Sequence, residues 1–348
     1  MSDALQIPSR PSSLAQAGDL RAVLEGAVCI PLQATGSLRV SGEDRVRWLN
    51  GMVTNSVVGL APGDGCYNYL LNAQGRIQGT AWAFAEPESL LLETDLSQVA
   101  PMMALLDRFI IMDDVELTDI SAETAGLLIA GPHASSALAQ CGFTDTRTPA
   151  QAGATLTELT WHCGRCRLIS KPGRLFPTWE LWSEPALVVE ISAALEAAGV
   201  IAATPDVLEW MRMLEGAPKF GVDIRDRDLP QETGQSEALH FSKGCYVGQE
   251  IVERIRSRGN VHRVFRGFLL NGALPCPGAA LEAGGKSVGE LTSVALLPRL
   301  PAYPAGLALG LGYIRREALE SGQELSYPNG TALPVSLPLD VNQPLPPA

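Results

Sequence analysis

The sequence predicts a mixed α+β fold with a small all-β domain at the C-terminal end of the chain. Up to about residue 260, strand-length apolar runs and amphipathic helical patterns occur together along the chain. From about residue 261 onward, short apolar runs are broken by Gly and Pro, which is typical of a small β-barrel or β-sandwich. The length of 348 residues exceeds what one hydrophobic core usually serves, so we expect two or three domains.

The predicted strands are apolar runs bounded by turn sequences. Residues 66–71, 77–84 and 90–93 are separated by turn sequences at residues 72–75 and 86–88, which is the pattern of a β-meander. Similar runs occur before and after this meander. These further strands are expected at residues 38–40, 115–117, 127–130, 264–270, 287–297, 306–314 and 333–337, with two more between residues 165 and 182.

The predicted helices have recognisable ends. Residues 41–44, Ser-Gly-Glu-Asp, match a capping box that opens a helix. Pro132 suits a first helical turn, where its missing donor is harmless, and Gly199 ends a helix that begins at Pro185. Residues 204–206, Thr-Pro-Asp, cap another helix. The helices are expected after residue 44, around residues 102–109, after residue 132, and over residues 185–198, 206–214 and 251–255.

Composition and charge restrict the class of function. Hydrophobic residues make up 46% of the chain and charged residues 18%, which is typical of an ordered globular protein. The formal net charge of −12 opposes stable binding to nucleic acid or to an anionic membrane, so we expect a small-molecule ligand or a protein partner. No stretch reaches the ~20 apolar residues that a membrane helix needs, so no membrane association is expected.

The N-terminal residues and the cysteines indicate the cellular compartment. Residues 1–20 contain several Ser and Pro and no apolar core of a signal peptide, so they are expected to form a flexible tail. The 7 cysteines are an odd number, which favours free thiols in a reducing compartment over a disulfide framework. A cytoplasmic protein is therefore expected.

The most unusual stretch is residues 243–250, Lys-Gly-Cys-Tyr-Val-Gly-Gln-Glu, which precedes a helical pattern. Gly244 and Gly248 permit backbone conformations closed to other residues and let a flat ligand approach the main chain. If the helix begins near Gly248, its free N–H groups favour a thiolate at Cys245, and Lys243 adds to this effect. The alternative is an ordinary loop and helix start around a buried cysteine.

This motif resembles the signature of the YgfZ group of folate-binding proteins, which are relatives of the glycine-cleavage aminomethyltransferase, or T-protein. The match at residues 243–250 is specific, whereas the Ala-Gly-Pro sequence at residues 130–132 alone is weak. The resemblance covers nearly the whole chain except for the first residues and the extreme C-terminus. Further matching segments lie at residues 40–44, 48–51, 71–77, 215–223 and 289–293.

The resemblance implies two interleaved α+β domains of aminomethyltransferase-like fold and a small C-terminal β-barrel, arranged around tetrahydrofolate or a one-carbon folate derivative. It also implies a role in iron–sulfur cluster assembly or repair, and thereby in tRNA modification, with iron–sulfur proteins or their assembly factors as partners. The corresponding division is a tail at residues 1–20, a first α+β domain at residues 21–53 and 120–260, a second at residues 54–119, and the barrel at residues 261–348.

The resemblance places the candidate site at the motif and at Glu215. Cys245 and Lys243 are the expected reactive pair. In the family, an Arg-x-Glu-Ala-Gly segment supplies a carboxylate that pairs with pterin N–H donors, and here Arg212 precedes Glu215 by three positions instead of two. The alternative is that Glu215 is an exposed residue at a helix end. The expected ligand-binding residues are Glu215, Gly244, Tyr246, Gly248, Gln249, Glu250 and Arg254.

The chain departs from the aminomethyltransferases at one informative place. Those enzymes carry an Asp pair, one member of which acts on the folate nitrogen and the transferred group, where this chain has Gln78-Gly79-Thr80. The missing acid/base role is typically worth about 10²–10⁴-fold in rate. Residues 90–94 likewise replace a family Asn that contacts the pterin. We therefore expect an accessory protein, with a folate-dependent one-carbon transferase as the alternative and a scaffold without folate as the third possibility.

A basic cluster follows the motif in an otherwise acidic chain. It would attract an anion such as a polyglutamylated folate tail, an RNA phosphate or an acidic partner protein. The alternative is a solvated face balanced by acids such as Glu253. Arg254 is the favoured member because it directly extends the signature. The cluster comprises Arg254, Arg256, Arg258, His262, Arg263 and Arg266.

The sequence His162-Cys163-x-x-Cys166 is the remaining candidate for a metal site or a thioredoxin-like redox site. A structural zinc site needs four ligands, and this segment offers three locally. The flanking residues have a strand pattern, which would point Cys163 and Cys166 to opposite faces. We therefore expect neither a zinc site nor a thioredoxin-like redox site here.

Overall fold

The computed structural model describes residues 16–144, 153–172, 175–259 and 261–342 of the chain. The chain divides into two compact units. The first consists of Met1–Leu71, Gln78–Pro205 and Glu237–Val247, and the second of Asn72–Ile77, Asp206–Ser236 and Gly248–Ala348. Of the expected tail, residues 1–15 lie outside the described residues, and residues 16–20 belong to helix α1 (Gln16–Glu25). The predicted division into a tail and three domains stays a prediction.

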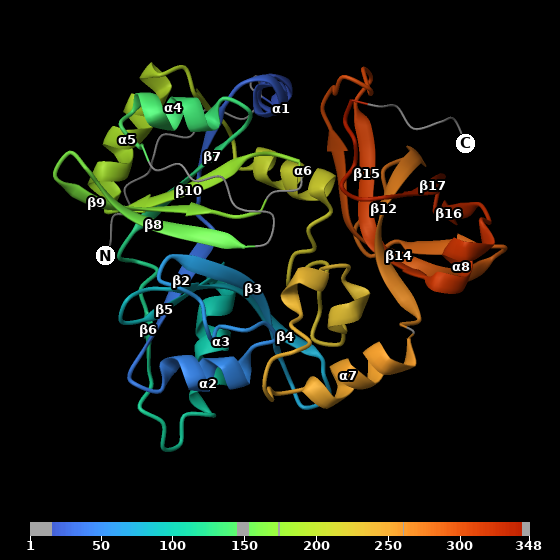
Figure 1. The fold of residues 1–348 in the computed structure, drawn as a ribbon. Helices are drawn as coiled ribbons and strands as arrows, with labels where there is room; N and C mark the ends of the chain where they lie inside the picture. Colours follow the sequence, from blue (N-terminus) through green and yellow to red (C-terminus); the bar gives the residue numbers. More distant parts are fainter. Residues whose placement is uncertain (1–15, 145–152, 173–174, 260, 343–348) are drawn as a thin grey trace. The chain divides into compact units, whose positions relative to one another are not determined.

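The first unit is built on an 11-stranded sheet (Figure 1). At one edge β1 pairs parallel with β11, and on its other side it pairs antiparallel with β7. The predicted meander is present as β3, β4 and β5, which are consecutive neighbours in the sheet. The full order is β11 (Ile201–Ala202), β1 (Val28–Pro31), β7 (Ala125–Ala130), β10 (Thr178–Ser183), β9 (Gly164–Ser170), β8 (Ala154–Trp161), β3 (Asp64–Leu71), β4 (Ile77–Ala85), β5 (Leu90–Asp95), β2 (Thr35–Ser41) and β6 (Glu116–Asp119).

This sheet curls so that its two halves face each other. Among the described residues, β3 and β8 join the two halves through the pairs Asp64↔Thr155 and Gly65↔Ala154. An apolar cluster that includes Leu91 from one half and Ile169 and Trp182 from the other fills the space between them. Figure 1 shows β8, β9 and β10 lying over β2, β5 and β6. Strands that are distant in the sheet order therefore lie opposite one another.

Two larger cores hold the helices of the first unit against the sheet. One contains Trp48 on α2 (Arg45–Met52) and Met102 on α3 (Leu96–Asp107). The other contains the buried residues of α4 (Ala134–Gln140) and α5 (Pro185–Ala197). Helix α5 begins at a proline, as predicted, and is followed by Gly199 in the left-handed region at φ 89°.

The start of α2 differs from the prediction. The Asp44 side chain makes no capping hydrogen bond to its own helix. Instead, the Asp44 carboxylate accepts the backbone N–H of Asp114 at 3.0 Å, and the Asp114 carboxylate accepts the N–H of Glu43 at 3.1 Å. Gly42, at φ 99°, allows this close approach because a Cβ there would lie 2.1 Å from the Asp114 carbonyl oxygen. The capping-box prediction is wrong because a distant segment takes the capping carboxylate.

The second unit contains a closed barrel, as predicted for the C-terminal region. Its core includes the buried side chains of Phe268, Leu281 and Ile314. Three helices accompany the barrel, namely α6 (Asp206–Glu215), α7 (Gln249–Arg258) and α8 (Arg316–Ser321). The barrel order is β12 (Arg263–Gly272), β15 (Leu307–Arg315), β14 (Lys286–Leu297), β13 (Ala280–Ala283), β16 (Leu325–Tyr327) and β17 (Gly330–Val335). The prediction of an α+β fold with a C-terminal β-barrel is confirmed.

Among the described residues, none of the helices combines the length and the apolar character that crossing a membrane would require.

Candidate functional site

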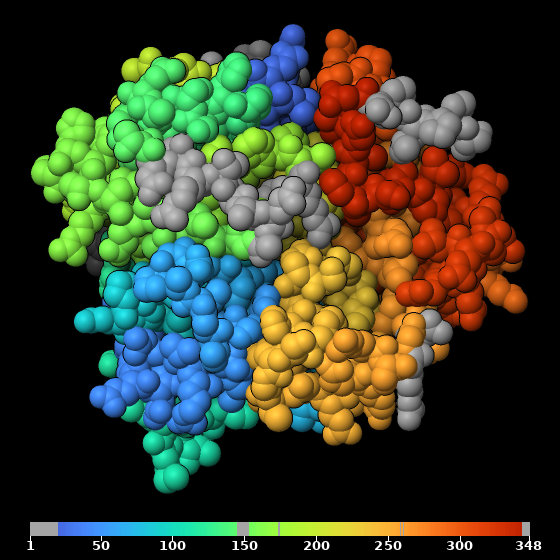
Figure 2. Space-filling model, viewed as in Figure 1, coloured from blue at the N-terminus to red at the C-terminus, as the bar shows by residue number. Residues whose placement is uncertain are grey.

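The predicted reactive loop lies at the end of the first unit. Cys245 and Gly244 are exposed, whereas Tyr246 is buried. Figure 2 shows the gold-coloured chain around these residues at the molecular surface. The backbone N–H of Val247 donates to the carbonyl of Gly51 at 3.1 Å, which attaches the loop to the end of α2. The interpretation of Cys245 as a buried structural cysteine is therefore wrong, and its thiol is open to solvent.

The ammonium of Lys243 is held by backbone carbonyls, and its predicted effect on the Cys245 thiol stays a prediction. Its ammonium donates to the carbonyl oxygens of Asn50, Val53 and Asn55 at 2.8, 2.7 and 2.5 Å. An ammonium has three donors, so these carbonyls use all of them. The ring of Tyr246 lies 5.1 Å from the same nitrogen. Lys243 thus fixes the loop onto residues 50–55.

The environment of Lys243 weakens its charged form. Burial lowers the pKa of Lys243 to about 8, and the nearby Cys66 opposes this shift to a smaller extent. Burial also raises the pKa of the Cys66 thiol, with an opposing hydrogen bond from Asn68. Lys243 is therefore a partly buried cation that is held by neutral carbonyls and a ring.

The rest of the motif belongs to the second unit and begins helix α7. Gly248 is the N-cap residue and has the left-handed φ of 82°, as expected for one of the two glycines. Gly244 is not among the glycines with positive φ, and a Cβ there would meet no atom within 4 Å. The backbone at this position therefore does not require a glycine, contrary to the prediction. Glu250 and Arg254 are exposed on α7. The site that joins these residues to Cys245 stays a prediction.

Glu215 is the last residue of α6 and is half-buried, so the alternative of a fully exposed helix end does not hold. Its predicted contact with a pterin stays a prediction. The neighbouring Arg212 donates to the buried carboxylate of Asp223 at 2.6 Å and to the hydroxyl of Ser293 at 2.8 Å. The family-like segment at residues 215–223 is thus anchored by Arg212, which the sequence did not single out for this purpose.

The basic cluster after the motif separates into members with different environments. Arg263 donates to Asp228 at 2.6 Å and to Glu232 at 3.0 Å, and its guanidinium lies 4.7 Å from the ring centroid of Tyr313. Burial opposes the charge of Arg263, but these two carboxylates outweigh burial and raise its pKa. Arg254 is exposed on α7. Internal acids already pair with Arg263, so Arg263 is not available to an external anion, and an anion site at the other members of the cluster stays a prediction.

A charged cluster that the sequence interpretation missed lies between the halves of the curled sheet. Lys171, just after β9, donates to Glu180 on β10 at 2.6 Å and makes a very short contact with Glu93 on β5. The side chains of Lys171, Glu93 and Glu180 are only 18%, 5% and 12% exposed. Two aromatic rings adjoin them: the Lys171 nitrogen lies 5.9 Å from the Trp82 ring, and Trp82 lies 5.2 Å from Tyr67 between ring centroids.

The electrostatics of this cluster favour binding of a hydrogen-bond donor. Burial, and then the charge of Glu180, raise the pKa of Glu93 to about 7. Burial alone would lower the pKa of Lys171, but the two carboxylates raise it. Oε2 of Glu93 and Oε2 of Glu180 are buried and accept no N–H or O–H donor from another residue of the described part of the chain, and a hydrogen bond between the two carboxyls contributes to the raised pKa of Glu93. Buried carboxylate oxygens without partners are costly, so this cluster can accept N–H donors from a ligand.

A signal for this cluster was present in the sequence. Glu93 ends an apolar run that begins at Leu90, and Glu180 is flanked by Trp179 and Leu181, so both acids belong to strands whose neighbours are apolar. A carboxylate in such a strand is expected to be paired when it is buried. The partner Lys171 could not be identified in this way, because its position depends on the curl of the sheet.

The predicted departure at residues 78–80 is present in the structure. The backbone N–H of Thr80 donates to Oε1 of Gln98 at 3.1 Å, and the hydroxyl of Thr94 donates to the Thr80 carbonyl at 2.7 Å. Neutral amide and hydroxyl groups hold this segment of β4. The segment therefore offers no ionisable side chain for acid/base chemistry.

The cysteines of the chain are all free thiols, as predicted. Cys163 lies in the turn between β8 and β9, next to His162 at a left-handed φ of 51°, and not in a strand as predicted. Cys166 is buried on β9. Among the residues that the structure describes, no group of three or more His, Cys, Asp or Glu side chains could hold a metal ion.

The fold and the curled sheet define a protein of the aminomethyltransferase-like class. The structure of glycine cleavage system aminomethyltransferase T from Bartonella henselae matches with a TM-score of 0.80 at 18% identity, covering 94% of this chain and 90% of that chain, which establishes the fold. Residues 4–243 match the model of the GCVT N-terminal domain, and the chain belongs to this family.

Curated relatives extend over most of the chain. A putative chloroplastic transferase of Arabidopsis thaliana is 26% identical over 309 residues, which is 86% of this chain and 68% of that protein. An aminomethyltransferase of Nostoc sp. is 27% identical over 320 residues, which is 87% of this chain and 81% of that protein. The similarity therefore includes the C-terminal region beyond the family domain.

Proposed function

We propose that this protein is a folate-binding accessory protein of the YgfZ type, which supports iron–sulfur cluster assembly or repair and thereby tRNA modification. The specific motif at residues 243–250 supports the YgfZ assignment. The family match and the aminomethyltransferase relatives support a folate ligand, namely tetrahydrofolate or a one-carbon derivative. The partners in this proposal are iron–sulfur proteins or their assembly factors, and neither nucleic acid nor a membrane is bound stably.

The observation that carries the folate proposal is the pair of buried carboxylate oxygens on Glu93 and Glu180 that accept no N–H donor from the residues that the structure describes. A pterin is a flat ring with N–H donors along one edge, and a buried carboxylate is the natural acceptor for such an edge. The rings of Tyr67 and Trp82 add flat apolar surfaces beside the carboxylates. When bound, a reduced folate would supply one-carbon chemistry. Lys171 would keep the carboxylates oriented toward the ligand.

The residues predicted from the motif keep proposed roles. We assign to the exposed Cys245 the contact with the iron–sulfur partner, because a thiol open to solvent can reach a protein surface. Lys243, Gly244 and Tyr246 shape the loop that presents it. Glu215 remains a proposed second acceptor for the pterin. Further contacts with the ligand are proposed for Gly248, Gln249, Glu250 and Arg254.

A folate-dependent one-carbon transferase is the second candidate function. One observation favours it: the pKa of Glu93, raised to about 7, suits a general acid or base at neutral pH. Against it, residues 78–80 carry no carboxylate where the family's transferase Asp stands. The accessory function therefore remains the main proposal. In this proposal the accessory protein acts in the cytoplasm.

Titration with tetrahydrofolate by calorimetry tests the folate proposal. We expect saturable binding by the wild type and at least about tenfold weaker binding by Glu180→Gln, because a charge-assisted hydrogen bond is lost. Glu184→Gln, which changes an exposed acid in the same unit, is the matched control and should bind like the wild type. If Glu215→Gln alone weakens binding, the pterin contact belongs to Glu215. If the wild type does not bind, the scaffold without folate is correct.

An assay for methylene-tetrahydrofolate formation from an aminomethyl donor separates the two candidate functions. We expect no turnover above background by the wild type, because residues 78–80 lack the acid/base carboxylate. Robust turnover that is lost in Glu93→Gln would establish the transferase and reject the accessory proposal.

A further inference from the structure

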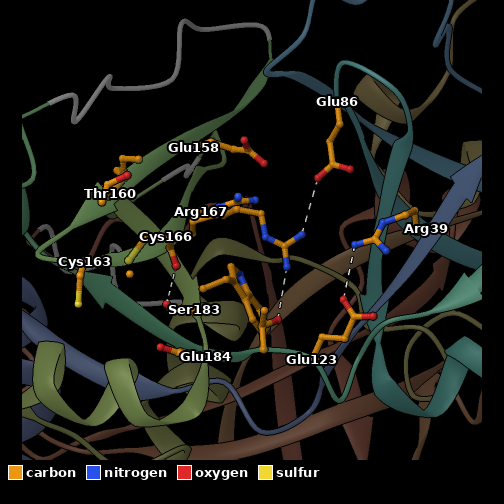
Figure 3. A pocket seen from close by; sticks show the side chains of 15 residues that line it. Arg39, Glu86, Glu123, Glu158, Thr160, Cys163, Cys166, Arg167, Ser183 and Glu184 are labelled. Atoms are coloured by element: carbon orange, nitrogen blue, oxygen red, sulfur yellow. Dashed lines mark hydrogen bonds and ion pairs between the residues drawn. The ribbon is translucent and has the colours of Figure 1, made fainter.

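The first unit contains a second candidate ligand site, distinct from the cluster around Lys171. It is a pocket of about 770 Å³ formed by β8, β9, β10 and their neighbours (Figure 3). This volume lies within the range of small-molecule sites, roughly 300–1,000 Å³. Its charged lining is Arg39, Arg165, Arg167, Glu86, Glu123, Glu158 and Glu184.

Arg167 is a nearly buried guanidinium whose contacts are long. Its side chain is 15% exposed, and its distance to Glu86 is 3.8 Å. Its hydrogen bond to the hydroxyl of Thr124 measures 3.4 Å. By contrast, the pairs Arg212–Asp223 and Arg263–Asp228 in the same chain each measure 2.6 Å. Charge-assisted N–H···O bonds are normally about 2.7–2.9 Å long, so Arg167 has uncommitted donors.

Arg39 provides a second guanidinium in the same pocket. It is 38% exposed, and its distance to Glu123 is 3.5 Å. Figure 3 shows the side chains of Arg39 and Arg167 extending toward each other from opposite sides of the pocket. A planar carboxylate between them could accept N–H donors from both guanidinium groups, because each presents a fork that matches carboxylate geometry.

The acids of the pocket restrict what kind of anion fits. The lining has one more acid than it has arginines, so its field does not favour a free anion. Glu158 and Glu184 are exposed at the pocket and have no ion pair among the described residues. A ligand that carries an ammonium group as well as a carboxylate satisfies both sets of charges. We propose that this pocket binds a small zwitterionic amino acid, with its carboxylate held by Arg39 and Arg167 and its ammonium held by the pocket glutamates.

The pocket is separate from the proposed folate cluster although both involve β9. Arg167 on β9 and Lys171, just after the end of this strand, are four positions apart in the chain, with Ile169 between them. Ile169 is buried in the apolar cluster that also contains Trp182 and Leu91. This cluster fills the space between the two charged groups. Amino-acid binding is therefore independent of whether the protein binds folate.

Calorimetric titration of the full chain with ω-amino acids tests this inference. The probes are 4-aminobutyrate and 6-aminohexanoate, compared at equal ionic strength with butyrate, hexanoate, butylamine and hexylamine. We expect saturable binding of at least one amino acid, and at least about tenfold weaker binding of its analogue that lacks either charge. No saturable binding of either amino acid would overturn the proposal. Equal binding of the carboxylate-only analogue would also overturn it, because it would indicate a simple oxyanion site.

Variants locate the binding. We expect Arg39→Gln and Arg167→Gln each to weaken amino-acid binding by at least about tenfold. Arg21→Gln, an exposed arginine on α1, is the matched control and should bind like the wild type. Arg39→Gln decides the result if Arg167→Gln does not fold, since Arg39 is the more exposed of the two. Wild-type affinity in a folded Arg39→Gln would reject this pocket as the site.

Discussion

The guanidinium of Arg212 donates to the fully buried carboxylate of Asp223 at 2.6 Å. The other oxygen of Asp223 accepts the hydroxyl protons of Thr292 and Ser293 at 2.5 and 2.7 Å. Burial opposes the charge of Arg212, but its acidic partners, including Glu209, outweigh burial and raise its pKa. Asp223 therefore connects helix α6 to strand β14 through charged and neutral donors.

Removal of Arg212 should strongly destabilise the second unit. In Arg212→Met, the Asp223 carboxylate stays buried without its cationic partner, and breaking such a pair costs about 3–5 kcal/mol. Urea unfolding measures this loss. Arg227→Met is the matched control: its side chain is 61% exposed and its distance to Glu290 is 3.3 Å, so we expect a loss below about 1 kcal/mol. Equal losses in the two variants would contradict the assigned role of Asp223.

The elements of the fold were predictable where the signal is local. Neighbouring residues alone predict strands β3, β4 and β5, because each is an apolar run bounded by turn sequences. A proline likewise marks the start of α5. The start of α2 at Asp44 was not predictable. The backbone N–H of Asp114, from another segment, donates to the Asp44 carboxylate, which therefore does not cap its own helix. Long-range contacts of this kind leave no periodic pattern in the sequence.

Replacing Lys243 should destabilise the loop that presents Cys245. In Lys243→Met, the carbonyl oxygens of Asn50, Val53 and Asn55 lose their donor, and unsatisfied buried acceptors cost about 1–3 kcal/mol. Thermal and urea unfolding measure the change. Lys286→Met, at an exposed lysine of the barrel, should leave stability nearly unchanged. A neutral effect of Lys243→Met would show that water replaces the ammonium.

The same lysine should give a pH signature. The pKa of Lys243 is lowered from 10.5 to about 8 in the folded protein, so between these values the unfolded chain binds more protons. Stability of the wild type, relative to Lys243→Met, should therefore rise as the pH increases from 8 to 10.5. Urea unfolding at several pH values measures the difference. A decrease over this range would mean that the carbonyls stabilise the charged form more than burial disfavours it.

The candidate site was only partly predictable. The motif at residues 243–250 could be recognised as a contiguous string, and its Cys245 is exposed in the structure. The cluster of Lys171, Glu93 and Glu180 could not, because its members come from β5, β10 and the end of β9 and meet only when the sheet curls. The carbonyl partners of Lys243 could not be predicted, because the sequence does not show which carbonyls lie within reach of its ammonium.

The buried Glu93 should make stability fall as the pH rises through the acidic range. Its pKa is raised from 4.5 to about 7 in the folded protein, so within this window the folded chain binds more protons than the unfolded chain. Ionisation above pH 7 then costs stability that is retained below pH 4.5. Relative to Glu93→Gln, the wild type should lose stability between pH 4.5 and 7 in urea unfolding. A difference independent of pH would show that Lys171 offsets burial and holds the pKa of Glu93 near its ordinary value of 4.5.

The exposed thiols allow a direct test of the role proposed for Cys245. Cys245→Ala should fold with unchanged stability, because an exposed side chain contributes little packing. It should nevertheless fail to restore the activity of iron–sulfur enzymes in cells that lack this protein. Cys276→Ala, which changes another exposed free cysteine, is the matched control and should restore that activity fully. Restoration by Cys245→Ala at equal protein levels would remove the thiol from the proposed function and leave the folate ligand as its chemical basis.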